Sequence, residues 1–347
     1  MIASPTYEIE WIQAIAGQLG KRGDPKILEK VIHAFTLLEQ LKLTGLDFIF
    51  KGGTSLLLLS SPPRRFSIDI DIITACPAEE LTPYLDKVTG MGSFSRWIGD
   101  NERKHPTEAP VAHYKFYYTS RIGTKFGEEP ILLDVLFQAH PYPKLVPTPI
   151  RHPWLQITGE VLSVDIPAVE AIAGDKLTAF APTTTGILYT KERAVEIIKQ
   201  LYDIAYLFDG SSDLGLLRES YIRVVAEEIK YRKLSLTWKD TLEDSFQTAL
   251  LITERDLKNE KFLHLQKGIS HIVNFVLERF RIEEATICAA KVAYLTKILR
   301  LEGMDIQRYA GPGPLAEWKI GGDRYQKLNR LKRTNPEAFF YWSLALQ

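Results

Sequence analysis

Residues 50–72 read FKGGTSLLLLSSPPRRFSIDIDI, and this stretch decides the fold class of the chain. It begins at the end of a short β-rich run, LDFIF (46–50), and the Gly-Gly pair after Lys51 predicts a tight turn into a short helix over TSLLLLSS. Pro62 and Pro63 end that helix, and the alternation in FSIDIDIIT (66–74) predicts a strand with isoleucines on one face. The stretch therefore predicts a strand, a glycine turn, a short helix and a second strand in close succession.

Asp69 and Asp71 lie on the polar face of that second predicted strand. Residues two apart on a strand point the same way, roughly 6.5 to 7 Å apart along the backbone. Two carboxylates in that arrangement can share hard cations such as Mg²⁺, which binds through carboxylate, phosphate and water oxygens. The alternative is an edge strand whose acidic face is simply solvated.

The glycine turn supplies a second element of chemistry. Gly52 and Gly53 allow backbone N–H groups to approach a phosphate closely, and the N-terminus of the following helix favours an anion. Thr54 and Ser55 can either cap the helix or bind a phosphate oxygen, and a plain turn with an N-cap remains the alternative. The P-loop pattern GxxxxGK[ST] and the dinucleotide pattern GxGxxG are both absent.

Composition narrows the protein class without indicating a function. The 347 residues carry 43 Lys and Arg against 43 Asp and Glu, which excludes a generally basic nucleic-acid binder but not a local basic patch. Cys76 and Cys288 lie far apart, so neither a disulfide framework nor a thiolate zinc site is expected. No apolar run approaches the roughly 20 residues that span a bilayer, and the first residues do not resemble a secretory signal. We therefore expect a cytoplasmic protein with no membrane segment.

The helical and β-rich patterns divide the chain in two. Helical spacing over 9–19 and 25–38 precedes the decisive stretch, and β-like runs follow it at SFSRWIG, VAHYKFYYTS, PILLDVLFQ and VLSVDIP. The proline-rich tract 140–154 predicts a connecting loop, and almost everything after 167 predicts helices, one of them over 260–280. We expect an α+β fold with two domains: a mixed sheet with flanking helices over 1–160, and an all-helical C-terminal region over 161–347.

The combination of GGTS with DxD resembles the DNA polymerase β-like nucleotidyltransferase superfamily. Within it, FKGGTSL followed by RRFSIDID resembles the AbiEii-type toxins, and the strong match covers about 25 residues. The resemblance implies a polymerase β-like fold and an enzyme that transfers a nucleoside monophosphate from an NTP to an acceptor hydroxyl. It assigns Gly52, Gly53, Thr54 and Ser55 to the triphosphate, and Asp69, Asp71 and Asp134 to Mg²⁺ or Mn²⁺ as metal ligands and catalytic residues. Asp134 is chosen because it is the only acid in the apolar run PILLDVLFQ.

Two later positions extend this resemblance. Lys176 in AIAGDKLTAF matches a family lysine that would neutralise triphosphate charge, and Asp203 in KQLYDIAYLF would orient that lysine or the nucleotide. For both residues the alternative is a solvated helix surface. The sequence departs from the family pattern at Gln200, where an acid is common, and in the all-leucine run 56–59, where some members carry a lysine. These departures leave the choice of NTP and the catalytic strength open.

The resemblance also implies an RNA acceptor, commonly the 3′ end of tRNA, and a cognate antitoxin as partner. Basic and aromatic residues alternate over 113–126 and 229–239, and 324–333 is strongly basic. Packing tyrosines and solvated helix faces are the alternatives there. Ser67 is a candidate regulatory phosphorylation site, because a phosphate beside two acids would repel metal and triphosphate. Modification of a protein or small-molecule hydroxyl, and a catalytically inactive nucleotide-binding module, remain as other functions, and the oligomeric state is open.

Overall fold

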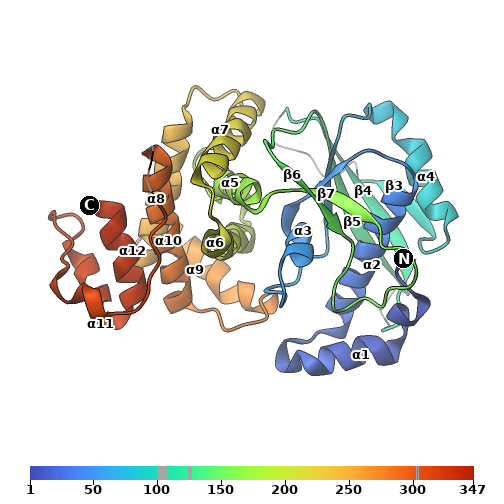
Figure 1. Cartoon of the computed structure of the whole chain (residues 1–347), viewed down its shortest axis with the longest axis horizontal. Helices are drawn as coiled ribbons and strands as arrows, with labels where there is room; N and C mark the ends of the chain where they lie inside the picture. The colour runs from blue at the N-terminus through green and yellow to red at the C-terminus, as the bar shows by residue number, and fades with distance from the viewer. Residues whose placement is uncertain (101–107, 124–126, 302, 304) are drawn as a thin grey trace. The chain divides into compact units, whose positions relative to one another are not determined.

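The computed structural model describes residues 1–347 except 101–107, 124–126, 302 and 304 (Figure 1). The described residues form two compact units. The first unit comprises Met1–His140, Leu145–Pro167 and Phe275–Glu278, and the second comprises Pro141–Lys144, Ala168–Asn274 and Arg279–Gln347.

The first unit is built on a seven-stranded mixed sheet with the order β3-β4-β5-β2-β1-β7-β6. The pairs β2–β5 and β1–β7 are parallel, and all other neighbours are antiparallel. The strands are β1 (Ile49–Lys51), β2 (Ile70–Thr74), β3 (Arg96–Gly99), β4 (Val111–Thr119), β5 (Glu128–Phe137), β6 (Leu145–Pro149) and β7 (Ser163–Pro167).

Helix α2 packs against β2 and β5 and forms much of the core of this unit. It begins as the sequence predicts: the Asp24 carboxylate accepts hydrogen bonds from the N–H groups of Lys26 and Ile27, and Pro25 occupies the first turn. Its buried His33 stacks on Tyr118 of β4 with 3.6 Å between ring centroids. The α-helices of this unit are α1 (Ile9–Gln18), α2 (Pro25–Leu43), α3 (Gly52–Leu59) and α4 (Thr82–Gly90), with short 3₁₀ helices at Ser4–Tyr7, Gly20–Arg22 and Ala78–Glu80.

Alternation along β5 separates a core face from a polar face. Leu133 and Val135 are fully buried, and successive strand residues point to opposite faces. Asp134 lies between them and is only half-buried, so its side chain projects from the face opposite the core. Its counterpart Asp71 on β2 lies in the same way between the buried Ile70 and Ile72.

The predicted connecting loop over 140–154 is wrong in part, because Leu145–Pro149 forms the edge strand β6. β6 pairs with β7 alone. Directly after the strand, Ile150 N donates a hydrogen bond to Leu162 O at 2.8 Å. Hydrogen-bonded positions alternate along such a strand, so Pro147 and Pro149 fall on the side that has no strand to pair with. Proline is tolerated on a sheet edge because its missing N–H is not needed there.

Two other predicted elements are shorter than expected. β2 begins at Ile70 instead of residue 66, so Asp69 lies immediately before the strand. The helix expected over 260–280 ends at His271, and residues 275–277 turn back to pair with 64–66. Phe66 N donates to Phe275 O at 2.8 Å, and Leu277 N donates to Arg64 O at 2.9 Å. A segment distant in the sequence thus anchors the chain that leads into Asp69 and β2.

The second unit is helical, as the sequence predicts (Figure 1). Helix α10 is buried along most of its length and packs against α6, α8 and α12, while α5 packs against α6 and α7. Its α-helices are α5 (Val169–Ala179), α6 (Ala194–Gly210), α7 (Leu214–Tyr231), α8 (Trp238–Glu254), α9 (Glu260–His271), α10 (Ile282–Arg300), α11 (Leu331–Thr334) and α12 (Pro336–Leu346), with 3₁₀ helices at Tyr189–Lys191, Ile272–Asn274, Gly313–Glu317 and Gln326–Arg330. The expected fold class, a mixed sheet with flanking helices followed by a helical C-terminal region, is confirmed.

In the part of the chain that the structure describes, none of the helices combines the length and the apolar character needed to cross a membrane.

Candidate active site

Four polar residues lie side by side in one row across four strands of the sheet. The register pairs Lys51 of β1 with Asp71 of β2, Asp71 with Asp134 of β5, and Asp134 with His113 of β4. Residues paired in this way project from the same face, and neighbouring strands lie about 4.8 Å apart. The sheet therefore brings together two of the predicted carboxylates, Asp71 and Asp134, and places a basic residue on either side of them.

The glycine turn meets this row at Asp71. Gly52 has a φ of +80°, which favours glycine, and a Cβ at this position would overlap the Asp71 carboxylate. A Cβ on Gly53 would come within 2.6 Å of the Arg65 guanidinium and 2.8 Å of Ser67 Oγ. The positive φ and the close approach of Asp71 both favour glycine at Gly52, and the N-terminus of α3 begins directly beside a carboxylate of the row.

The hydroxyl groups after the glycines are used within the protein. Thr54 and Ser55 are completely buried. Thr54 Oγ1 lies 2.5 Å from the Asp69 carbonyl oxygen and 2.9 Å from Ser67 Oγ, and Ser55 Oγ donates to the Gly52 carbonyl at 2.8 Å. These contacts tie α3 to the segment before β2, so the two hydroxyls shape the turn, and the backbone of Gly52 and Gly53 is the part of it nearest the carboxylates.

Asp69 is close in sequence to the row but stands outside the strand. It precedes the first residue of β2 and is half-buried. In the described residues no three His, Cys, Asp or Glu side chains form a group that could hold a metal ion. The structure therefore pairs two of the predicted acids, Asp71 and Asp134, and Asp69 lies two residues before Asp71, just outside the strand.

The chemistry of the pair still fits a hard divalent cation. Mg²⁺ commonly uses one or two protein carboxylates and takes its remaining ligands from water and substrate phosphates. Asp71 and Asp134 supply two carboxylates, and the missing Cβ of Gly52 leaves the backbone close to Asp71. A divalent cation bound by this pair would also offset the repulsion between two neighbouring negative charges.

His113 is a member of the row that the sequence prediction missed. Its Nδ1 lies 2.7 Å from Asp134 Oδ1, and the two side chains are 11% and 22% exposed. The only signal in the sequence was the alternation VAHYKFYYT, in which His113, Lys115 and Tyr117 share one strand face. The partner of His113 depends on the register between β4 and β5, which that alternation does not specify.

Lys176 and Asp203, the two later candidates, pair with each other in the second unit. Lys176 Nζ lies 3.1 Å from Asp203 Oδ2, and the two side chains are 10% and 2% exposed. The alternative of a solvated helix surface is therefore wrong for both residues. Because each charge is buried and paired, the contact holds the lysine ammonium in a fixed position.

The basic segments give little support for an RNA surface. In the C-terminal run, Arg330 donates to the carbonyls of Thr253 and Glu254, and Lys332 donates to the carbonyls of Ala316 and Trp318. Over 113–126, Lys115 forms a 3.0 Å ion pair with Asp100, and Arg121 one of 2.8 Å with Glu8; residues 124–126 lie outside the described chain. Two arginines, Arg64 and Arg65, also lie shortly before Ser67. Arg65 is buried, and Arg64 forms an exposed ion pair with Glu278.

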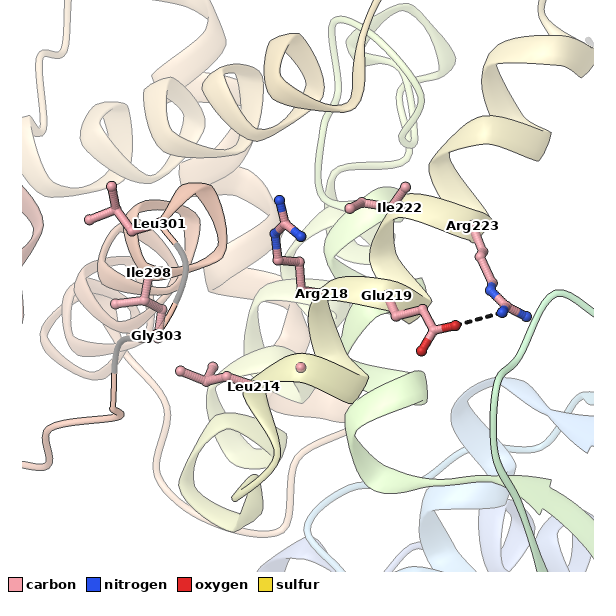
Figure 2. A pocket seen from close by; sticks show the side chains of 9 residues that line it. Leu214, Arg218, Glu219, Ile222, Arg223, Ile298, Leu301 and Gly303 are labelled. Atoms are coloured by element: carbon pink, nitrogen blue, oxygen red, sulfur yellow. Dashed lines mark hydrogen bonds and ion pairs between the residues drawn. The ribbon is translucent and has the colours of Figure 1, made fainter.

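A cavity of about 480 Å³ lies within the second unit, and its lining includes none of the candidate site residues. Figure 2 shows its lining side chains on α7 and at the end of α10, with Glu219 joined to Arg223. Its remaining lining is largely aliphatic, including Leu214, Ile222 and Ile298. It contains neither paired carboxylates nor a glycine turn, so it does not compete with the row on the sheet as a site for phosphate chemistry.

Comparison with known proteins identifies the family of the chain. A family model described as "Nucleotidyl transferase AbiEii toxin, Type IV TA system" matches residues 36–273, which is more than half of the chain. Among solved structures, the Helicobacter pylori protein JHP933 is similar at 14% identity and a TM-score of 0.43, over 78% of this chain and 94% of its own. A second H. pylori protein, provisionally described as a nucleotidyltransferase, is similar at 16% identity and a TM-score of 0.41, over 79% and 95%.

No curated protein matches the chain. The family match spans the glycine turn, β2 with its aspartate, β5, and the helices that carry Lys176 and Asp203. The chain belongs to the AbiEii family of nucleotidyltransferase toxins of type IV toxin–antitoxin systems, and it is a nucleotidyltransferase.

Proposed function

We propose that this nucleotidyltransferase transfers a nucleoside monophosphate from an NTP to an RNA acceptor, such as the 3′ end of tRNA, in a Mg²⁺-dependent reaction. We further propose that it acts in the cytoplasm as the toxin of a toxin–antitoxin system and has a cognate antitoxin. Residues 1–160 would form the nucleotidyltransferase domain, and 161–347 a helical domain. The observation that carries the proposal is the pairing of Asp71 with Asp134 beside the Gly52 turn.

The residues of the row have separate tasks in this reaction. Asp71 and Asp134 would hold Mg²⁺, with Asp69 reaching the same ions from the entry to β2. The bound Mg²⁺ would polarise the α-phosphate and neutralise charge on the departing pyrophosphate. Asp134, as the acid further from the glycine turn, would orient the attacking hydroxyl or accept its proton.

The triphosphate would lie along the start of α3. Backbone N–H groups at a helix N-terminus bind anions, and the absence of side chains at Gly52 and Gly53 permits the approach. Thr54 and Ser55 would fix the turn through their internal hydrogen bonds. Lys176, oriented by Asp203, would add a positive charge for the phosphates, and phosphorylation of Ser67 would oppose their binding.

The test is transfer of label from NTP to RNA. The full-length protein is incubated with each α-³²P-labelled NTP, Mg²⁺ and total tRNA, and the products are separated on a denaturing gel. We expect labelled tRNA with wild-type protein and none with Asp71→Asn or after removal of Mg²⁺ by EDTA. Label in RNA that survives Asp71→Asn would reject the assignment of the site.

The same reaction distinguishes the other functions. Label that appears in a protein or small-molecule fraction and not in RNA would favour a different acceptor hydroxyl. NTP binding in calorimetry, without turnover on any acceptor, would favour an inactive nucleotide-binding module, consistent with Gln200 and the leucines at 56–59.

A further inference from the structure

We propose that His113 is a positioning residue for Asp134. The Nδ1–H of His113 holds the Asp134 carboxylate in the orientation that binds a divalent cation. This inference rests on the proposed function in one respect, since it takes Asp134 as a metal-binding carboxylate. It assigns a role to a residue that the family pattern in the sequence did not include.

The contact is held by the sheet and not by chance side-chain placement. His113 and Asp134 are directly paired in the β4–β5 register, and Nδ1 lies 2.7 Å from Oδ1. The backbone of His113 is fixed as well, because its carbonyl accepts a hydrogen bond from Asp100 N at 2.7 Å. Side chains that are 11% and 22% exposed have little freedom to exchange this contact for water.

The chemistry of the contact assigns its direction. An ionised carboxylate only accepts hydrogen bonds, so the imidazole Nδ1 must carry the proton that it donates to Asp134. One oxygen of Asp134 is then engaged by His113, and this limits rotation of the carboxylate. Groups that orient metal-binding carboxylates in this way matter for metal affinity, and their removal typically costs about 10- to 100-fold.

The position of Asp71 explains why such a support is needed. Asp71 and Asp134 are paired neighbours of the same charge, and their mutual repulsion favours turning the Asp134 carboxylate away from Asp71. Lys51 is paired with Asp71 on one side of the row, and His113 with Asp134 on the other. His113 therefore opposes a rotation that would separate the two carboxylates.

Three substitutions separate this role from simple packing. His113→Asn keeps an N–H near the position of Nδ1, His113→Gln moves its amide toward the position of Nε2, and His113→Leu removes the donor while filling the space. His271→Asn, at an exposed histidine of α9, serves as the control for the histidine-to-asparagine change. Thermal unfolding of each variant shows whether it folds.

The measurement is a titration of the full-length protein with Mn²⁺, in which electron paramagnetic resonance gives the concentration of free Mn²⁺ and hence the affinity. We expect His113→Leu and His113→Gln to weaken Mn²⁺ binding by about 10- to 100-fold, and His113→Asn and His271→Asn to bind as the wild type does. The proposal is overturned if His113→Leu binds Mn²⁺ normally, if His113→Asn loses as much affinity as His113→Leu, or if the wild type binds no Mn²⁺.

The positioning role and the proposed function can be rejected independently of each other. Mn²⁺ binding that depends on His113, together with no labelling of RNA by the wild type, would reject the RNA acceptor and keep the positioning role. Labelling of RNA that needs Asp134, together with unchanged Mn²⁺ binding in His113→Leu, would keep the enzyme and reject the positioning role.

Discussion

The two units each place acids beside basic groups, but in different arrangements. In the second unit, Asp203 is almost completely buried and forms one ion pair with one lysine, Lys176. In the first unit, Asp71 and Asp134 are neighbours of like charge on the half-buried face of a sheet. The buried pair joins opposite charges, whereas the row places two like charges side by side, an arrangement that suits a divalent cation.

We therefore expect substitutions in the row and in the buried pair to differ in their effects on transfer activity and on stability. A substitution in the row should impair transfer while the fold persists, because the row lies on the half-buried face of the sheet and not in its core. A substitution in the buried pair should impair folding, because it leaves an uncompensated charge in the interior. The following predictions test this contrast in order of decreasing effect.

The largest effect is expected for Asp71→Asn. Losing a carboxylate that holds the metal should lower kcat by about 1,000-fold, equivalent to about 4 kcal/mol in the barrier. The melting temperature should change little, since asparagine keeps the shape of a side chain that lies on a half-buried face. Labelling kinetics and thermal unfolding provide the measurements, with Asp47→Asn as a control at an exposed acid of the same unit.

Lys176→Met tests how much the buried ion pair between Lys176 and Asp203 contributes to stability. It leaves Asp203 buried without its partner, and we expect it to lower the free energy of unfolding by about 3 to 5 kcal/mol. The double variant Lys176→Met/Asp203→Leu should recover most of that loss in urea unfolding. A single variant as stable as the wild type would show that the pair does not support the second unit.

Acid should destabilise the protein partly through His33. Burial lowers the pKa of His33 to about 4, from an ordinary value of 6.5. Below pH 6.5 the unfolded chain takes up a proton that folded His33 refuses, so stability is complete above pH 6.5 and is lost as the pH falls toward 4. The loss amounts to about 3 kcal/mol, and His33→Leu should remove that share of the pH dependence in urea unfolding between pH 7 and 4. An unchanged slope would contradict the burial of a neutral imidazole.

A smaller effect on transfer is expected at the glycine turn, and Gly45, which precedes β1, provides a matched control for Gly52. Gly52 and Gly45 both have positive φ, but only a Cβ on Gly52 would meet another group, Asp71. Each alanine substitution should cost about 1 to 2 kcal/mol for the left-handed backbone. Only Gly52→Ala should also reduce transfer by more than about tenfold, since it displaces a carboxylate of the row. Equal activities of the two variants would separate the turn from the site.

Much of the fold could be predicted because it depends on local patterns. The helical character of the second unit follows from its helical spacing, although α9 ends at His271 and not at 280, and α2 starts at Asp24 and Pro25 as its capping residues indicate. The glycine turn and the start of α3 follow from the conformational freedom of Gly52. The strand alternation identified Asp71 and the apolar run PILLDVLFQ identified Asp134 as candidates, and the sheet pairs the two.

The features that were missed depend on contacts between distant segments. The partner of His113 is set by the register of β4 against β5, and no local pattern fixes that register. β6 was predicted as a loop because its prolines are acceptable only on an edge, and the strand order decides which strand is the edge. The pairing of 64–66 with 275–277 joins segments about 210 residues apart in the sequence.

The most direct test of the central claim is to locate Mn²⁺ in crystals of the full-length protein soaked with MnCl₂ and an α,β-methylene NTP. The account predicts an anomalous peak bound by the carboxylates of both Asp71 and Asp134, with the triphosphate against the backbone of Gly52 and Gly53. A Mn²⁺ site that uses neither carboxylate, or a triphosphate bound away from the glycine turn, would contradict it.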